Sequence, residues 1–175
     1  MLVSVIIPTY NRLEPVMKTL ESLRQQTLPF DSFQVIVVDD GSPIDISAIT
    51  DIDFPFSLNL LRQKNQGATI ARNTGTQQSQ GDILVFIDDD VTVSPSALES
   101  LAEACTRDSQ VLAMGTLIQR SVSDTSPFTR ISIADANISY HLNDSRASDV
   151  EVHFSECNTQ LLAIRRDDFF TLGML

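Results

Sequence analysis

The feature that most constrains the fold of this chain is a short apolar run that ends in three consecutive aspartates. Ile83–Ile87 reads ILVFI, and the three residues that follow it, 88–90, are all Asp. A short apolar run rich in β-branched side chains is typical of a strand covered on both faces, as in a parallel sheet. Adjacent carboxylates repel one another unless positive charge lies beside them. The pattern therefore predicts a buried strand whose carboxyl end is a charged edge with a function.

Similar apolar runs alternate with helical patterns along the first part of the chain. This alternation predicts an α/β fold whose mostly parallel sheet is flanked by helices. The expected strands are Val3–Ile7, Val35–Val38, Leu58–Leu61 and Ile83–Ile87, and the expected helices cover residues 13–23, 67–78 and 94–105. Gly75 is the weak position of the second helix, because glycine is a poor helix former.

The pattern changes in the last third of the chain. Residues 119–149 are rich in Ser, Asp and Asn and predict loops or a loose helical insertion. Two strand-like segments, Val150–Phe154 and Gln160–Ile164, follow them. Because no linker divides the chain, we expect one domain over residues 1–175. A short helical pattern followed by Gly173 usually leads into further structure, so we also expect that the chain is a fragment.

Composition and charge exclude several classes of protein. The chain has 12 Lys+Arg against 23 Asp+Glu and a formal net charge of −11, which disfavours a nucleic-acid partner. No apolar run approaches the ~20 residues that cross a bilayer, and the first residues lack the features of a secretory signal. Cys105 and Cys157 form no CxxC pair, so neither a zinc site nor a disulfide framework is expected. We expect a cytoplasmic protein, which includes a place at the inner face of a membrane.

The three aspartates after Ile87 predict a metal site. Side chains alternate along an extended segment, so Asp88 and Asp90 can face one way while Asp89 faces the other. Carboxylate oxygens are hard ligands that select Mg²⁺ or Mn²⁺, and ligands bind at the carboxyl ends of strands in open α/β sheets. We therefore expect Mn²⁺ or Mg²⁺ beside Asp88 and Asp90. The alternative is an acidic turn that caps the next helix.

Asp39 and Asp40 follow another predicted strand in the same way and should lie at the same edge of the sheet. A carboxylate there could accept the imide N–H of uracil or a ribose hydroxyl. The alternative for this pair is an Asx-turn that leads into residues 41–43.

The first predicted strand runs into Pro8, Thr9, Tyr10 and, two residues later, Arg12. Tyr10 could stack on a base, the backbone carbonyl near Pro8 could read the edge of that base, and Arg12 could approach a phosphate. The alternative for Tyr10 is a packing role, which is commoner for a tyrosine after a strand.

Lys64 and Arg72 are two of only 12 cations in the chain, and Gly67 lies between them at a predicted helix N-terminus. This combination suits a diphosphate. The alternative is a capped surface helix in which Arg72 pairs with a structural carboxylate, for which one of residues 88–90 is a candidate.

Four segments resemble, in order, the successive motifs of glycosyltransferase family 2. They are residues 3–12 (VSVIIPTYNR), 37–42 (VVDDGS), 65–73 (NQG, then ARN) and 81–90 (GDILVFIDDD). Each motif is weak alone, but four in the family's order over residues 3–90 are a specific match. The resemblance implies the GT-A fold and a glycosyltransferase.

The resemblance also implies a role for each matched position. Asp90 would be the chief metal ligand, and Asp88 would contact the ribose or share the metal. Asp40, with Asp39 beside it, would bind the nucleotide base or ribose. The other positions implied to bind the nucleotide sugar are Pro8, Thr9 and Tyr10 at the base, Lys64, Asn65, Gly67 and Arg72 beside the sugar-diphosphate, Arg12 near the phosphates and Asp89 within the aspartate motif.

The implied reaction transfers a sugar from a nucleotide-diphosphate donor, with a UDP-sugar as the first choice, to a hydroxyl of a carbohydrate or lipid-linked acceptor. Family resemblance also implies inversion at the anomeric carbon. Residues 1–118 would form the nucleotide-sugar-binding half and residues 119–175 an incomplete acceptor-side part. The family's general base, a carboxylate in a Glu-Asp pair, would lie beyond Leu175.

Two other functions stay open on the sequence alone. One is a non-catalytic module that binds nucleotide sugars as a scaffold, which the expected position of the base beyond Leu175 favours. The other is a nucleotidyltransferase, which normally has a Gly-rich basic loop where this chain has residues 8–12. Dehydrogenase and NTPase functions lose their main support, because the sequence has neither G-x-G-x-x-G nor a P-loop motif.

Overall fold

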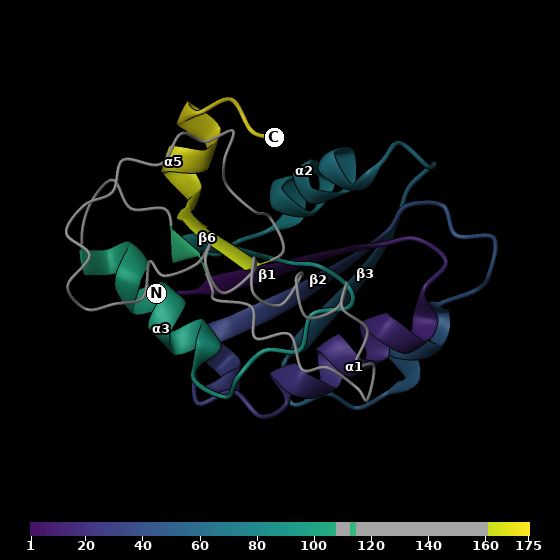
Figure 1. Cartoon of the computed structure of the whole chain (residues 1–175), viewed down its shortest axis with the longest axis horizontal. Helices are drawn as coiled ribbons and strands as arrows, with labels where there is room; N and C mark the ends of the chain where they lie inside the picture. Colours follow the sequence, from purple (N-terminus) through teal and green to yellow (C-terminus); the bar gives the residue numbers. More distant parts are fainter. Residues whose placement is uncertain (108–112, 115–160) are drawn as a thin grey trace, which may run out of the picture. The chain divides into compact units, whose positions relative to one another are not determined.

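The structure is a computed structural model and describes residues 1–107, 113–114 and 161–175. All of these residues belong to one unit, a six-stranded sheet with helices on both of its faces (Figure 1). The loops predicted for residues 119–149 and the strand predicted at Val150–Phe154 lie outside the described residues. The single-domain organisation predicted for the whole chain therefore stays a prediction.

The strands of the sheet follow the order β3-β2-β1-β4-β6-β5. Strands β3, β2, β1 and β4 are parallel, whereas β6 is antiparallel to both β4 and β5. Their bounds are β1 Val3–Thr9, β2 Phe33–Asp39, β3 Ser57–Arg62, β4 Ile83–Ile87, β5 Ala113–Met114 and β6 Leu161–Arg165. The mostly parallel sheet and the four strands predicted before residue 90 are confirmed. The segment predicted at Gln160–Ile164 forms β6, and β5 is too short to leave a periodic pattern.

Helices cover the sheet as the α/β prediction requires. Helices α2 and α5 lie on one face, and α1 and α3 lie on the other (Figure 1). Their bounds are α1 Leu13–Leu23, α2 Ala68–Gln78, α3 Ala97–Arg107 and α5 Arg166–Thr171, with short 3₁₀ helices η1 at Phe30–Ser32 and η2 at Ser47–Asp51. In the described part of the chain, every helix is too short or too polar to span a membrane.

The strand register brings the ends of β1, β2 and β4 to one edge of the sheet. Thr9, the last residue of β1, pairs with Asp39, the last residue of β2. Ile6 of β1 pairs with Phe86 of β4, so the chain that leaves β4 after Ile87 runs beside the end of β1. Because parallel strands end on the same side, the loops after these three strands are neighbours.

The packing of the core sets the direction in which the first aspartate leaves β4. Leu84 and Phe86 pack in one cluster with Ile6 and with Phe169 of α5, and the ring centroids of Phe86 and Phe169 lie 5.2 Å apart. Side chains alternate along a strand, so Asp88, two residues after Phe86, continues on this face of the sheet. The face carries α5 and α2 (Figure 1).

Helix α2 lies so close to the sheet that a side chain at Gly75 would not fit. A Cβ atom there would lie 2.6 Å from Cγ2 of Ile6 and 3.1 Å from Cγ2 of Val38. Glycine weakens a helix, but here it permits the close approach of α2 to β1 and β2. The approach accounts for the glycine that the helical pattern left unexplained.

Replacing Gly75 with Ala should lower the free energy of unfolding by about 1–3 kcal/mol, because the new methyl group must displace Ile6 or the helix. This strain outweighs the gain in helix propensity, which is at most ~1 kcal/mol. Denaturant unfolding followed by circular dichroism measures the change. Gln77→Ala, at an exposed position of the same helix, is the matched control and should change stability by less than about 0.5 kcal/mol. A Gly75→Ala protein as stable as the wild type would contradict this packing.

Candidate functional site

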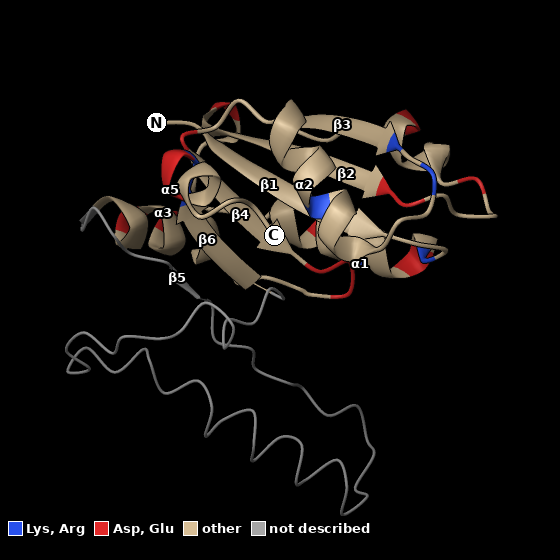
Figure 2. Cartoon of the chain, turned by 90° about the horizontal axis from the view of Figure 1, so that it is seen from above, with Lys and Arg blue, Asp and Glu red and all other residues tan. Residues whose placement is uncertain are grey.

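Polar and charged side chains of three loops meet where β1, β2 and β4 end. We call this region the carboxylate edge and define it as residues 9–12, 39–42 and 88–90. Acidic residues follow β2 and β4 directly, and a basic residue lies on the nearby part of α2 (Figure 2). The predicted neighbourhood of the two aspartate groups is therefore present in the fold.

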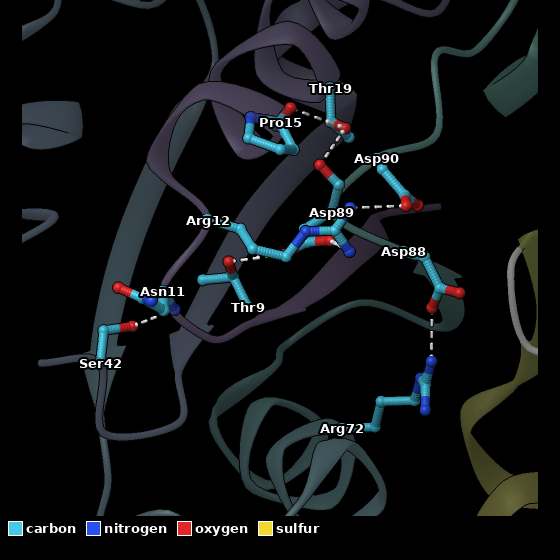
Figure 3. Close-up of polar contacts among 10 residues, drawn as sticks. All are labelled: Thr9, Asn11, Arg12, Pro15, Thr19, Ser42, Arg72, Asp88, Asp89 and Asp90. Carbon is cyan, nitrogen blue, oxygen red and sulfur yellow. Dashed lines mark hydrogen bonds and ion pairs between the residues drawn. The ribbon is translucent and has the colours of Figure 1, made fainter. Parts of the chain in front are cut away.

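Asp89 is buried and points toward β1 and α1 (Figure 3). Its Oδ2 accepts a hydrogen bond from Thr9 Oγ1 at 2.7 Å, and its Oδ1 lies 2.9 Å from Arg12 Nη1. Its backbone carbonyl accepts a hydrogen bond from Thr19 Oγ1 at 2.9 Å. These contacts join β4 to β1 and α1, so Asp89 holds the carboxylate edge together.

Asp88 faces the opposite side of the sheet from Asp89, as the alternation predicts, and pairs with Arg72 of α2. The distance from Arg72 Nη2 to Asp88 Oδ1 is 2.5 Å. Arg72 is only 7% exposed, and its Nε has no hydrogen-bond acceptor. The pairing of Arg72 with one of residues 88–90, which the sequence raised as an alternative, is therefore present.

Asp90 lies in the turn after β4, where the strand alternation no longer applies. Its Oδ2 accepts a hydrogen bond from Arg12 Nη2 at 2.8 Å. Arg12 thus forms an ion pair with Asp89 through one nitrogen and donates a hydrogen bond to Asp90 with the other (Figure 3). Asp90 is half-exposed, which makes it the most accessible of the three carboxylates.

Burial raises the pKa of both Asp88 and Asp89. The charge of Arg72 offsets part of the rise in the pKa of Asp88, and the hydrogen bond from Thr9 offsets part of the rise for Asp89. The pKa of Arg12 is raised, chiefly by its hydrogen bond to Asp90. When its carboxylates are ionised, the edge therefore favours further positive charge.

Asp39 ties the end of β2 to the loop after β1. Its Oδ1 accepts hydrogen bonds from the backbone N–H of Ser42, at 2.9 Å, and from the Ser42 hydroxyl. Ser42 Oγ in turn accepts the backbone N–H of Asn11 at 2.7 Å. Asp39 Oδ2 is buried without a hydrogen-bond donor and lies 3.5 Å from Arg62 Nε. The turn that the sequence raised as an alternative is present, and Oδ2 pairs with Arg62 without a hydrogen bond.

Asp40 holds the segment that leads into α2. Its Oδ1 accepts the backbone N–H of Gln66 at 2.9 Å and the side-chain amide of Gln63 at 2.7 Å. Its Oδ2 accepts the backbone N–H of Gly67 at 2.7 Å. Both oxygens are thus used to position the start of α2.

Gly41 lets the loop after β2 pack against the backbone of the segment before α2. Its φ is +78°, and a Cβ atom there would lie 2.8 Å from the backbone nitrogen of Asn65. Both the left-handed backbone and the close approach require glycine.

The other residues predicted for the site differ in exposure. Tyr10, Lys64, Asn65 and Gly67 are exposed, whereas Pro8 is buried within β1. Sequence reasoning missed Thr19, Ser42 and Gln63, which hold Asp89, Asp39 and Asp40 in place. Ser42 lies in the DDGS motif and could have been found there, but neither Thr19 nor Gln63 belongs to a motif.

The carboxylate oxygens of the edge suit a metal ion whose coordination shell is completed by a bound ligand. Among the residues that the structure describes, no group of three or more His, Cys, Asp or Glu side chains could hold a metal ion. Mg²⁺ in phosphate-transferring sites usually takes one or two carboxylates and completes its shell with phosphate oxygens and water. Asp88 and Asp90 are hard oxygen ligands of this kind, but Asp88 pairs with Arg72 and Asp90 with Arg12, so an ion bound together with a diphosphate would have to displace at least the more exposed of these contacts, the one between Arg12 and Asp90.

Open α/β sheets bind their ligands at the carboxyl ends of the strands, and the carboxylate edge lies at that position. The sequence model of the family described as Glycosyl transferase family 2 matches residues 4–169. The chain therefore belongs to glycosyltransferase family 2. The family and the GT-A fold implied by the four motifs are confirmed.

Curated relatives are named as glycosyltransferases. An uncharacterized glycosyltransferase of Haemophilus influenzae is 39% identical over 102 residues, which are 58% of this chain and 34% of the relative. Glycosyltransferase AglE of Haloferax volcanii is 40% identical over 103 residues, which are 55% of this chain and 33% of the relative. The chain thus spans about a third of the length of these relatives.

Solved structures share the fold. The mannosyltransferase PcManGT of Pyrobaculum calidifontis, in complex with GDP-Man and Mn²⁺, has a TM-score of 0.73 at 23% identity and covers 98% of this chain and 46% of its own. TarS 1-349 of S. aureus, in complex with UDP-GlcNAc, has a TM-score of 0.60 at 27% identity and covers 71% of this chain and 37% of its own.

Asp40→Asn should lower the free energy of unfolding by about 2 kcal/mol, because an amide cannot accept the hydrogen bonds that both carboxylate oxygens now accept. Amide hydrogen exchange at Gly67 should become faster, since its N–H loses its acceptor. Asp51→Asn, at an exposed aspartate of η2, serves as the control and should change neither quantity. Unchanged exchange at Gly67 would show that Asp40 does not hold the start of α2.

The raised pKa of Asp89 makes its contribution to stability depend on pH. A carboxyl group whose pKa is higher in the folded state contributes fully below the pKa of the unfolded chain, about 3.9, and loses that contribution as the pH rises through the folded value. Asp89→Asn cannot titrate, so its stability should fall less steeply above about pH 4. Urea unfolding at a series of pH values measures both slopes, and equal slopes would contradict the prediction.

Proposed function

We propose that this chain binds the donor of a glycosyltransferase that moves a sugar from a nucleoside diphosphate sugar to an acceptor hydroxyl. The observation that carries the proposal is the carboxylate edge, where a half-exposed Asp90 lies at the ends of the strands in a member of this family. Residues 1–118 form the donor-binding half in this proposal, and residues 119–175 contribute to the acceptor side.

The loops after β1 and β2 bind the nucleotide base in this proposal. Tyr10 is 48% exposed, so its ring is available to stack on a base. Asp39 Oδ2 is buried, accepts no hydrogen bond and lies 3.5 Å from Arg62 Nε, so it would accept an imide N–H or a ribose hydroxyl once the ligand displaces that contact. We propose UDP as the nucleotide, and the UDP-GlcNAc complex of TarS supports this choice. The GDP-Man complex of PcManGT makes GDP the alternative to test.

Asp90 and Asp88 would hold Mn²⁺ or Mg²⁺ beside the donor diphosphate. The ion supplies positive charge that stabilises the leaving diphosphate. Lys64 is exposed and can donate to phosphate oxygens, and the buried Nε of Arg72 is a second donor that has no acceptor. The neighbouring PcManGT structure, with Mn²⁺ bound, supports a metal in this fold.

The acceptor in this proposal is a hydroxyl of a carbohydrate or a lipid-linked sugar, and the transfer inverts the anomeric carbon. Inversion requires a general base that takes the proton of the acceptor hydroxyl. Arg12 and Arg72 hold the three carboxylates after β4, so we assign the base to a carboxylate elsewhere in the protein. We propose a cytoplasmic location, including the inner face of a membrane with lipid-linked acceptors.

Thermal unfolding with UDP or GDP, each with and without Mn²⁺, tests the proposal. A ligand at about 100 times its Kd stabilises the native state by about 2.7 kcal/mol, which shifts Tm by several degrees. We expect that shift only when Mn²⁺ and the nucleotide are both present. Asp90→Ala should lose most of the Mn²⁺-dependent shift, because the accessible ligand is gone. Asp51→Ala removes an exposed aspartate of η2 and should keep the whole shift.

Other outcomes would favour other functions. Stabilisation by UDP or GDP that does not depend on Mn²⁺ would favour a binding module without catalysis. Stronger stabilisation by UTP or GTP than by the diphosphates would favour a nucleotidyltransferase. Either result would contradict the proposed metal-dependent glycosyltransferase.

A further inference from the structure

We infer that Arg12 makes metal binding at the carboxylate edge depend on the nucleotide. In the absence of ligand, its guanidinium serves as an internal cation on Asp90, and it exchanges this carboxylate for a donor phosphate when nucleotide and metal bind together. The inference rests on the proposed function and adds to it the residue that couples the two ligands.

Arg12 bridges two carboxylates that differ in exposure (Figure 3). Its Nη1 lies 2.9 Å from Oδ1 of Asp89, and its Nη2 lies 2.8 Å from Oδ2 of Asp90. The Asp89 side chain is 6% exposed and also accepts a hydrogen bond from Thr9, whereas the Asp90 side chain is 48% exposed. In the described part of the chain, Arg12 is the only side chain with a hydrogen bond or ion pair to Asp90. The contact with Asp90 is therefore the more easily broken of the two.

The backbone that carries Arg12 is fixed, although its side chain is 46% exposed. The carbonyl of Arg12 accepts the backbone N–H of Val16 at 3.2 Å in the first turn of α1. The preceding residue, Asn11, has φ +57° and donates its backbone N–H to Ser42 Oγ. A fixed backbone with an exposed side chain allows the guanidinium to turn from one partner to another without movement of the loop.

Arg72, which pairs with Asp88 from α2, lacks this freedom. The side chain of Arg72 is buried, only 9% exposed, and remains paired with Asp88. A metal ion that binds Asp88 and Asp90 without a nucleotide must break the contact between Arg12 and Asp90, and it lies beside two guanidiniums of like charge. Binding of the metal alone is therefore weak.

A diphosphate reverses this balance of charge. Its oxygens are acceptors that the planar guanidinium of Arg12 can bind with two parallel hydrogen bonds. Asp90 is then free for the ion, and the ion in turn neutralises the phosphates. Each ligand thus raises the affinity for the other, and by linkage the two enhancements are equal.

The test measures Mn²⁺ binding rather than activity, from the electron paramagnetic resonance signal of free Mn²⁺. Wild type and Arg12→Gln are titrated without nucleotide and with UDP or GDP, whichever stabilises the wild type in thermal unfolding. Arg12→Gln should bind Mn²⁺ alone about tenfold more tightly than the wild type, because a neutral amide neither repels the ion nor holds Asp90 as strongly. The enhancement of Mn²⁺ affinity by the nucleotide should shrink by about tenfold in the same variant.

Arg24→Gln is the matched control, because it removes one exposed positive charge that pairs with Glu21 at 3.5 Å and lies outside the carboxylate edge. It should keep both Mn²⁺ affinities of the wild type.

If Arg12→Gln does not fold, Arg12→Lys decides the question. Lysine keeps the charge but cannot bridge two carboxylates as a planar fork. The Arg12→Lys variant should bind Mn²⁺ alone severalfold more tightly than the wild type, and the nucleotide should enhance its Mn²⁺ affinity less.

The results separate this inference from the proposed function. If wild type binds Mn²⁺ with the nucleotide but the Arg12 variant binds Mn²⁺ alone no more tightly, the inference is wrong and the proposed function stands. If wild type binds no Mn²⁺ even with UDP or GDP, the proposed function itself fails, and the role of Arg12 fails with it.

Discussion

Two arginines pair with the three carboxylates after β4, and the arrangement of the carboxylate edge depends on these ion pairs. Asp89 is buried, and a buried carboxylate is strongly unfavourable unless a cation or hydrogen-bond donors compensate it. Arg12 approaches from the start of α1 and Arg72 from α2, on opposite faces of the sheet. The same pairs that stabilise the charges therefore hold both helices against the end of β4, so electrostatics and tertiary packing are one constraint here.

Asp39 and Asp40 are adjacent in sequence, but they organise different parts of the edge. Asp39 connects to the loop after β1 through Ser42, and Asp40 connects to the start of α2 through the backbone of Gln66 and Gly67. Successive side chains of an extended segment point in opposite directions, so two neighbouring carboxylates can serve two loops. The edge is thereby built from three loops that share contacts, and the exposed side chains of Tyr10 and Asp90 extend from it.

The elements with a periodic pattern could be predicted from the sequence, and so could their meeting at one edge. Buried strands such as Ile83–Ile87 have continuous apolar runs, and parallel strands must end on the same side. Beyond the pairing of Arg72 with one of residues 88–90 and the turn at Asp39, the partners of the carboxylates could not be predicted, because they depend on geometry between distant segments. Asp90 does not follow the alternation of side chains along β4, because it lies in a turn. Thr19 of α1 contacts the backbone of Asp89 through a tertiary contact that no local pattern encodes. Gly75 shows the same limit, since its close contact with Ile6 depends on how α2 packs on the sheet.

The hydrogen bonds of Asp40 to residues more than 20 positions away have a practical consequence. Because it accepts hydrogen bonds directly from Gln66 and Gly67, the start of α2 takes its position from β2. The exposed tip at residues 43–45 takes no part in these hydrogen bonds. A peptide tag or a fluorescent label inserted at this tip would leave the contacts between β2 and the start of α2 in place, which provides an attachment point for immobilising the protein away from the carboxylate edge.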